Sequence, residues 1–208
     1  MDSSLPLILA SGSAGRRWLM DQAGLPFSIK VSSVREPESG FTHPASMVNA
    51  IAWLKARAVA AETESGRIIA ADTIAWIDGK PLLKPTDRMN ARDMMNALQG
   101  RIHELWTGVV IWDKPQNHQY SWQECSLVRI RPMNGKKIEE YLETRIWEGC
   151  SGSYAIDGER DPVVQVVRGS VSNIVGLPME SLTQVLNWLS QKKHAHARNE
   201  QAEIPSLM

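Results

Sequence analysis

Short apolar runs alternate with longer amphipathic stretches along this chain, and the two periodicities predict strands and helices in turn. The runs that predict strands lie at 7–10, 27–33, 67–71, 102–112, 119–131, 154–158, 163–167 and 171–175. The stretches that predict helices lie at 16–23, 44–64, 88–98, 134–144 and 178–189. Elements that alternate in this way are typical of an α/β fold, here with some antiparallel pairing.

The middle of the chain carries two turn signals. The strand at 67–71 is expected to end at Asp72–Thr73, and residues 74–77 either continue it or form the next strand. Asp78–Gly79, which follows directly, is the dipeptide that most strongly predicts a hairpin turn.

A chain of 208 residues is long enough to bury a substantial core, and no internal repeat or linker divides it. From Gln191 onward the chain is polar, which favours a frayed end. The sequence therefore predicts one domain over 1–190 and a disordered tail over 191–208.

Charge and cysteine usage narrow the functional classes. The 23 Lys and Arg residues balance 23 Asp and Glu residues, which disfavours a nucleic-acid partner but not a small anionic ligand. Cys125 and Cys150 form no Cys-x-x-Cys pair, so a disulfide scaffold and a zinc site are both disfavoured. No basic leader is present, and no stretch approaches the roughly 20 apolar residues that a membrane helix needs. A cytoplasmic protein without membrane contact is expected.

The segment Ser11-Gly12-Ser13-Ala14-Gly15-Arg16 joins the first strand to the first helix. Small residues let backbone amides approach a phosphate, and the helix N-terminus, two hydroxyl groups and a guanidinium add donors. The Walker pattern Gly-x4-Gly-Lys-Ser/Thr is absent, which excludes a P-loop ATPase. The segment is equally compatible with an ordinary loop in which a serine caps the helix.

Asp72 and Thr73 follow a buried apolar run, at the position where α/β sheets bind ligands. A carboxylate there can hold a metal ion or activate water, or it can simply cap a turn. Lys84, which precedes Pro85, follows the hairpin turn that would fold the chain back toward Asp72. Its ammonium could contact a phosphate, or it could be an ordinary surface lysine.

Glu36 and Lys55 are the remaining charged candidates. Glu36 lies in a proline-containing loop, and Lys55 lies near the apolar stripe of its helix, four residues after Ile51. A lysine in that position must either pair with an acid or extend its ammonium to the surface.

The order and spacing of these segments resemble the Maf family of nucleoside triphosphate pyrophosphatases over residues 6–190. Glu36 matches an acidic residue that the family places in the loop after its second strand. The other matching blocks are Ser-x-Ser-x-x-Arg at 11–16, Ala-x-x-Lys-Ala at 52–56, Ala-Asp-Thr at 71–73, Lys-Pro at 84–85, Leu-x-Gly-Arg-x-His at 98–103, Thr-Gly at 107–108, and the C-terminal segments 152–156 and 173–178.

The resemblance implies an elongated α/β fold, with a mixed β-sheet, flanking helices and two lobes around a deep cleft, often as a homodimer. It implies a hydrolase of acid anhydrides that splits standard or modified nucleoside triphosphates into monophosphate and pyrophosphate with Mg²⁺ or Mn²⁺. Asp72 would be the general base or a metal ligand, and Glu36 would help hold the metal. The phosphates would be gripped by Lys55, Lys84, Arg16, Ser11 and Ser13, and Thr73 would lie near the base or ribose.

Three positions depart from the common family pattern. Ala14-Gly15 stands in place of Pro-Arg, so one phosphate-facing arginine is missing, and Arg35 stands where an acid usually precedes Glu36. Asp157 stands where a glutamine often reads the base. An ionised aspartate only accepts hydrogen bonds, whereas glutamine also donates. We therefore hypothesise that Asp157 faces the base and weakens selectivity for thymidine and uridine nucleotides.

The departures at Ala14-Gly15 and Arg35 leave one alternative open, a nucleotide-binding regulator of cell division with little turnover. Such a protein would keep its phosphate ligands and lack a working base, yet Asp72 and both candidate lysines are present. His103 lies on a predicted strand, where a lone histidine is more often structural, and no histidine is assigned to a metal.

Overall fold

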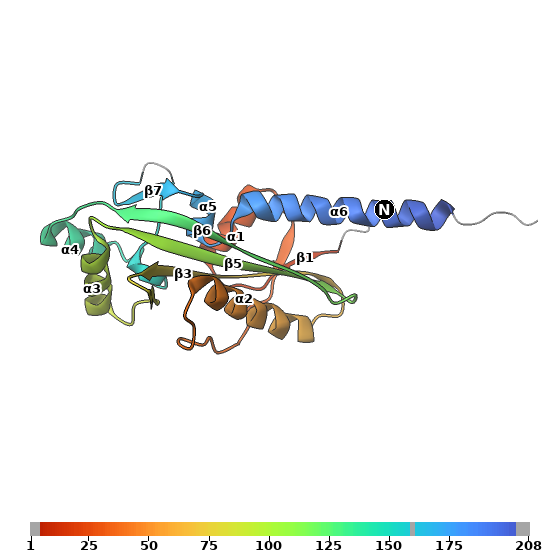
Figure 1. The fold of residues 1–208 in the computed structure, drawn as a ribbon, viewed down its shortest axis with the longest axis horizontal. Coiled ribbons are helices and arrows are strands. Elements are labelled where there is room, and N and C mark those ends of the chain that lie inside the picture. The colour runs from red at the N-terminus through yellow and green to blue at the C-terminus, as the bar shows by residue number, and fades with distance from the viewer. Residues whose placement is uncertain (1–4, 159–160, 203–208) are drawn as a thin grey trace, which may run out of the picture.

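A computed structural model describes residues 5–158 and 161–202, with side chains up to Gln191 in the last helix. A seven-stranded mixed sheet runs along the elongated molecule in the order β2-β1-β3-β5-β6-β7, with β4 added to β3 (Figure 1). The strands are β1 (Leu7–Leu9), β2 (Phe27–Ile29), β3 (Gly66–Ile77), β4 (Lys80–Leu82), β5 (Ile102–Lys114), β6 (His118–Ile130) and β7 (Val164–Arg168). The helices are α1 (Ala14–Gln22), α2 (Pro44–Ala61), α3 (Arg88–Leu98), α4 (Gly135–Glu143), α5 (Val171–Val175), α6 (Met179–Ala202) and a short 3₁₀ turn η1 (Ser151–Ser153). The expected α/β class, with a mixed sheet and flanking helices, is confirmed.

β3 pairs with three other strands of the sheet, and its two edges are covered unequally. On one edge β5 pairs antiparallel with it from Gly66 to Trp76. On the other edge β1 runs parallel beside Arg67–Ile69, and β4 runs antiparallel beside Ala75–Ile77. Between these two short strands, residues 71–74 have no strand partner on that edge in the described part of the chain. The sheet therefore has a gap at the carboxyl end of β1.

Of the two options for residues 74–77, the structure confirms that they continue the strand, so Asp72 and Thr73 lie within β3 and not at its end. The strand continues because β5 supplies a hydrogen-bonding partner as far as Trp76. The hairpin at Asp78–Gly79 is confirmed, and both residues have the positive φ angles, 51° and 74°, that a tight turn of this kind requires.

The face of β3 that α2 covers is apolar except at one position. Ile68 and Ala70 pack in one buried cluster against α2, and Ile74 and Trp76 pack in a second. Asp72 lies between the two clusters, because alternate residues of a strand share a face.

The opposite face of β3 carries the alternate residues and has the same arrangement of two apolar clusters around one polar residue. Ile69 and Ala71 pack with α1 and α6, whereas Ala75 and Ile77 pack with α3 and α4 (Figure 1). Thr73 lies between them. The apolar core is thus divided along β3 on both faces, and Asp72 and Thr73 mark the division.

The segment 171–175, expected as a strand paired with 163–167, is the helix α5 instead. Ser170 caps it by accepting a hydrogen bond from the Asn173 backbone N–H at 3.2 Å, and Gly176 ends it with φ 115°. A serine cap and a terminal glycine six residues apart thus override the β-branched residues between them.

The expected strand at 154–158 is also wrong, since irregular chain follows η1 there. Side chains satisfy its backbone in place of a neighbouring strand. The Tyr141 hydroxyl accepts from the Ala155 N–H at 3.2 Å, and the buried Asp161 carboxylate accepts from the N–H groups of Asp157, Val163 and Val164 at 2.7–2.8 Å.

The last helix is longer than expected. α6 continues beyond residue 189 to Ala202 and extends past the end of the sheet (Figure 1). Residues 191–202 contain neither glycine nor proline, so backbone propensity favours the continuation. The expected tail is therefore helical as far as Ala202, and its last residues, 203–208, lie outside the described chain.

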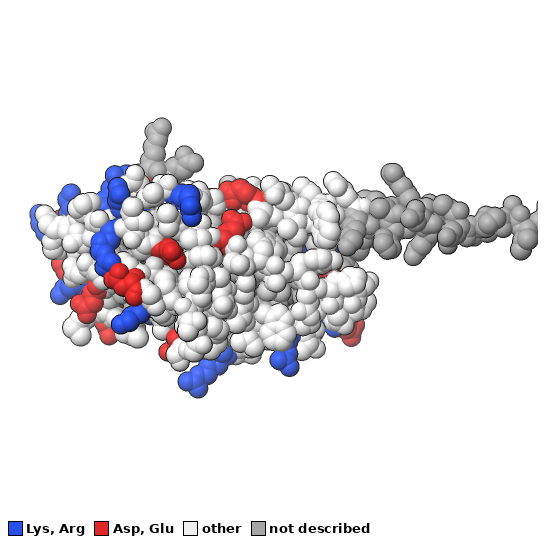
Figure 2. Space-filling view, in the orientation of Figure 1, with Lys and Arg blue, Asp and Glu red and all other residues white. Residues whose placement is uncertain are grey.

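Charged side chains of both signs are interspersed over the end that carries α3 and α4 (Figure 2). Arg88 pairs there with Glu139 and Glu143 at 2.9 and 2.7 Å, and Arg92 pairs with Glu139 at 2.6 Å. Exposed pairs of this kind contribute little to stability, although they link α3 to α4. Over the part of the chain that the structure describes, no helix is both long enough and apolar enough to span a membrane.

The close packing of α2 on β5 gives a test of the fold. A Cβ atom at Gly108 would lie 2.6–2.8 Å from backbone atoms of Val48 and Asn49. Backbone cannot yield as a side chain can, so Gly108→Ala should lower the free energy of unfolding by about 1–3 kcal/mol. Urea unfolding at neutral pH measures this. Gly135→Ala, where a Cβ meets nothing within 4 Å, is the matched control and should not destabilise.

Candidate active site

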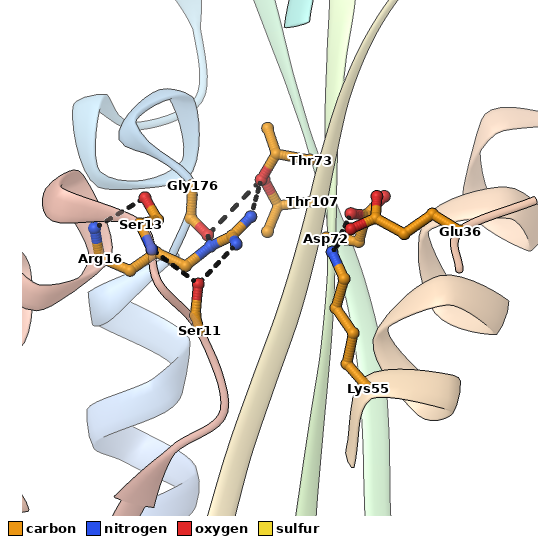
Figure 3. Close-up of polar contacts among 9 residues, drawn as sticks. All are labelled: Ser11, Ser13, Arg16, Glu36, Lys55, Asp72, Thr73, Thr107 and Gly176. Carbon is orange, nitrogen blue, oxygen red and sulfur yellow. Dashed lines mark hydrogen bonds and ion pairs between the residues drawn. The ribbon is translucent and has the colours of Figure 1, made fainter. Parts of the chain in front are cut away.

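Two groups of polar side chains flank β3 at the gap in the sheet (Figure 3). The loop after β1 and the start of α1 bring Ser11, Ser13 and Arg16 to one side. The loop before α2 and α2 itself bring Glu36 and Lys55 to the other side, where Asp72 points. Asp72 and Thr73 are consecutive residues of one strand, and they therefore serve opposite groups.

Ser13 caps α1, accepting a hydrogen bond from the Arg16 N–H at 3.4 Å. The buried Ser11 hydroxyl accepts from the Ser13 N–H at 3.2 Å and from Nη1 of Arg16 at 3.1 Å. The capping interpretation of this loop is therefore correct for Ser13. The same hydrogen bonds also place the hydroxyl groups of Ser11 and Ser13 and the N-terminus of α1 around the guanidinium of Arg16.

Arg16 is buried and donates to three neutral acceptors. Nε contacts the Gly176 carbonyl oxygen at 2.7 Å, Nη1 contacts Ser11, and Nη2 contacts the Thr73 hydroxyl at 3.0 Å. Burial lowers the pKa of Arg16, and the charges of Asp72 and Glu36 partly oppose that shift. None of the three contact partners is a carboxylate, so the positive charge is compensated only at a distance. This arrangement favours an added anion.

A chain of hydroxyl groups continues from Arg16 into the core. The Thr107 hydroxyl donates to the Asn173 carbonyl oxygen at 3.0 Å and lies 2.9 Å from the Thr73 hydroxyl. Since each hydroxyl has one proton, Thr73 donates to Thr107 while it accepts from Arg16. The Asn173 side chain, fully buried, donates to the Ser126 hydroxyl at 2.8 Å. β3, β5, β6 and α5 are thereby tied together behind the arginine.

Lys55 lies between two carboxylates on the other side of β3. Its Nζ is 2.7 Å from Oδ1 of Asp72 and 2.9 Å from Oε1 of Glu36. The side chains of Lys55 and Asp72 are only 10% and 9% exposed, whereas that of Glu36 is 38% exposed. Partial burial would raise the pKa of Glu36, but the hydrogen bond and charge of Lys55, with the charges of Lys84 and Arg16, lower it on balance. Lys55 therefore pairs with acids and does not extend to the surface.

Lys84 is exposed just after β4. Its charge contributes to lowering the pKa of Glu36. The hairpin between β3 and β4 is present, and the approach of Lys84 to Asp72 stays a prediction.

The donor set fits a hard divalent cation. Within the described residues no three His, Cys, Asp or Glu side chains gather as metal ligands. Glu36 and Asp72, however, already share one cation, the ammonium of Lys55. Mg²⁺ is commonly held by one or two carboxylates that are completed by substrate phosphates and water. Two carboxylates beside an anion-binding loop meet that requirement.

Asp157 is the predicted site residue that the structure does not bring to this group. Its side chain is exposed, and its backbone N–H donates to Asp161. The expectation that it faces the base stays a prediction.

Sequence reasoning did not single out three residues that contribute to the site. Thr107, Asn173 and Gly176 all lie inside the matched blocks, but the sequence did not indicate that they hold Arg16 and Thr73. The carbonyl of Gly176 can be reached only because α5 ends there, and α5 was expected as a strand.

Gly15, the position of the missing arginine, faces α5. A Cβ atom there would lie 2.9 Å from Cγ1 and 3.3 Å from the carbonyl oxygen of Val175. A larger residue at this position would therefore require α1 and α5 to separate. The close approach of the two helices explains why glycine fits here.

Two hollows of the described surface lie away from these residues. One, of about 380 Å³, lies between the start of α3 and the end of α4. The other, of about 390 Å³, lies between the start of α2 and the ends of β3 and β5. Neither is lined by Asp72, Lys55, Lys84 or Arg16. The deep cleft implied by the resemblance stays a prediction.

His103 is a buried structural residue. Its Nε2 lies 2.7 Å from the Tyr154 hydroxyl, and its ring packs edge-on against that tyrosine. Burial, with a smaller contribution from the charge of Arg101, lowers its pKa to about 4. The histidine is therefore neutral at physiological pH and lies in the core.

Comparison with known proteins places the chain among relatives of one kind. A family model described as "Maf-like protein" matches residues 6–189. A dTTP/UTP pyrophosphatase of Pelotomaculum thermopropionicum is 36% identical over 180 residues, covering 86% of this chain and 94% of that protein. Proteins of the same name from Bacillus cytotoxicus and Ruminiclostridium cellulolyticum are 36% and 35% identical, over 86% and 89% of this chain and 93% and 97% of their own lengths.

The lowered pKa of His103 predicts a pH-dependent stability. As pH falls from about 6.5 to about 4, the unfolded chain binds a proton at this histidine and the folded chain does not. Folding should therefore lose stability over that window, by about 3 kcal/mol at most. His103→Phe should remove this component of the slope, as measured by urea unfolding at pH 7 and pH 4.5. His118→Gln, at an exposed histidine, should keep it. An unchanged slope in His103→Phe would contradict the assignment.

Proposed function

This chain belongs to the Maf-like protein family, and from that membership and the site we propose that it is a nucleoside triphosphate pyrophosphatase. Such an enzyme is a hydrolase of acid anhydrides that converts a nucleoside triphosphate to the monophosphate and pyrophosphate. The observation that carries the proposal is the buried Asp72, which shares Lys55 with Glu36 directly across β3 from the Arg16 loop. A regulator with little turnover is not favoured, because a candidate base and the phosphate-binding cations are both present.

Each residue has a role that follows from its position. Arg16, with Ser11, Ser13 and the N-terminus of α1, binds phosphate oxygens and orients the chain of phosphates. Asp72 accepts the proton of the attacking water, which forms a bond to the α-phosphorus. The bond from that phosphorus to the bridging oxygen breaks, and pyrophosphate leaves.

The cations around the site stabilise the charge that builds up on the leaving pyrophosphate. Lys55 and Lys84 supply this stabilisation, and little covalent work is required of the protein. Thr73 is proposed to lie near the ribose or base, on the side of β3 that faces Arg16.

The activity depends on a divalent metal, which supplies Lewis-acid stabilisation of the phosphates when bound. Glu36 and Asp72 are the residues proposed to hold it, because they meet at one point and are oxygen ligands. Mg²⁺ and Mn²⁺ are the proposed ions.

The proposal for the substrate base rests on the names of the relatives and on Asp157, which stands where the family often has glutamine. The relatives are named dTTP/UTP pyrophosphatases. A carboxylate at Asp157 would present only acceptors to the base, and this favours bases with exposed donors, such as guanine and cytosine, over thymine and uracil. A substrate range broader than that of the relatives, including modified nucleotides, is therefore proposed.

The remaining proposals concern the setting of the enzyme. A cytoplasmic location is supported by the two unpaired cysteines. A small nucleotide partner, without nucleic acid or membrane, agrees with the balanced charge. A homodimer, which the resemblance implies, stays a prediction that sedimentation would test.

The role of Asp72 predicts the effect of removing its basicity. Asp72→Asn keeps the size of the side chain but cannot accept the proton, so pyrophosphate release should fall by about 10²–10⁴-fold. The measurement is pyrophosphate release from a panel of standard and modified nucleoside triphosphates with Mg²⁺ or Mn²⁺. Asp21→Asn, at an exposed position on α1, is the control. Wild-type protein that binds nucleotides but releases no pyrophosphate across the panel would favour the regulator.

The role of Asp157 predicts a change in base ranking. Asp157→Gln should shift kcat/KM toward dTTP and UTP by about tenfold, a change of about 1.4 kcal/mol, because the amide adds a donor for the base carbonyl groups. The same panel measures it. Identical rankings for the variant and the wild type would show that Asp157 does not select the base.

A further inference from the structure

The ammonium of Lys55 occupies the point where the two candidate metal ligands converge. It is held at 2.7 Å from Asp72 and 2.9 Å from Glu36, and its stem is buried along α2. The ammonium is thus a cation held between two carboxylates, one positive charge against their two negative charges.

A divalent ion cannot bind to this pair while Lys55 stays in place. Mg²⁺ takes oxygen ligands at about 2.0–2.1 Å, so an ion shared by both carboxylates would coincide with the present position of the ammonium. Two cations in such close contact would also repel each other strongly in a partly buried site. Metal binding to both carboxylates thus requires that Lys55 move.

The neighbouring charges indicate where Lys55 would find another partner. Nη2 of Arg16 donates at 3.0 Å to Thr73, the residue next to Asp72 in β3, and the charges of Arg16 and Lys84 both act on Glu36. Phosphates bound by those two cations would therefore lie beside the carboxylates. The flexible four-carbon stem of a lysine allows its ammonium to turn from the acids to an adjacent phosphate.

We propose that Lys55 occupies the metal position of the carboxylate pair in the nucleotide-free protein, and that substrate phosphates draw it away and free Glu36 and Asp72 for the divalent ion. This inference rests on the proposed function. Metal and nucleotide then bind cooperatively, and by thermodynamic linkage each raises the affinity for the other. A cation thus stays beside the two carboxylates throughout, first the single charge of the ammonium and then the double charge of the metal.

The test is Mn²⁺ binding to the full-length protein, followed by the EPR signal of free aqueous Mn²⁺. Lys55→Met removes the ammonium but keeps a chain of similar length, so it should bind Mn²⁺ at least about tenfold more tightly than wild type without nucleotide. Lys55→Arg keeps a cation between the acids and should stay weak. Lys84→Met removes the same charge from the site without emptying the pair, and its affinity should change by less than about threefold.

Nucleotide coupling is measured with α,β-methylene-dGTP, which carries a base that Asp157 is proposed to favour and whose scissile bond cannot be hydrolysed. The analogue should increase the Mn²⁺ affinity of wild type by a larger factor than that of Lys55→Met. Binding of Mn²⁺ by the analogue itself is the same in both titrations and cancels in the comparison. An equal factor in the two proteins would overturn the release of Lys55 by phosphates.

A folded Lys55→Met protein that binds Mn²⁺ no more tightly than wild type would show that Lys55 does not occupy the metal position. Circular dichroism checks that the variant is folded. Should Lys55→Met fail to fold, a wild-type Mn²⁺ affinity that the analogue does not raise would overturn the proposal by itself. Failure of the proposed function has a different signature, since wild type would then release no pyrophosphate whatever its Mn²⁺ affinity.

Discussion

The pairing of β3 with β5 over Gly66 to Trp76 is the constraint on which the site depends. A strand held along its whole length must alternate its side chains between two faces, so Asp72 and Thr73 cannot point the same way. Each lies between two apolar clusters on its own face. The site is therefore built from two halves that meet around one strand, at the gap between β1 and β4.

The two halves are charged in complementary ways. On one face a buried guanidinium is hydrogen-bonded by neutral acceptors only, and on the other a buried ammonium is shared by two carboxylates. The first half can gain an anion, and the second can exchange one cation for another. A metal–nucleotide complex carries both of these charges, which is why such a substrate suits the arrangement.

The structure explains some of the departures from the family pattern and not others. Gly15 has a physical reason, since any side chain there meets Val175 at the contact between α1 and α5. Arg35 has no structural explanation here. Asp157 lies on a segment whose backbone is held by the buried Asp161. A specificity residue would need that kind of support, although its own contact with the base stays a prediction.

Local pattern in the sequence determined most of the elements. The apolar runs and the hairpin at Asp78–Gly79 could be identified from it, because helix and strand periods and turn chemistry act over a few residues. The resemblance to the Maf family added Ser11, Arg16, Glu36, Lys55 and Asp72 as candidate site residues. Tertiary structure decided the rest. Val171–Val175 became a helix because a cap and a glycine outweighed strand propensity, and the carbonyl of Gly176 reached Arg16 across 160 residues of sequence. Asp72 lies within a strand because β5 extends it, and Lys55 pairs with acids because packing brings α2 onto that face. Contacts of this range depend on how distant elements pack, and no local pattern encodes them.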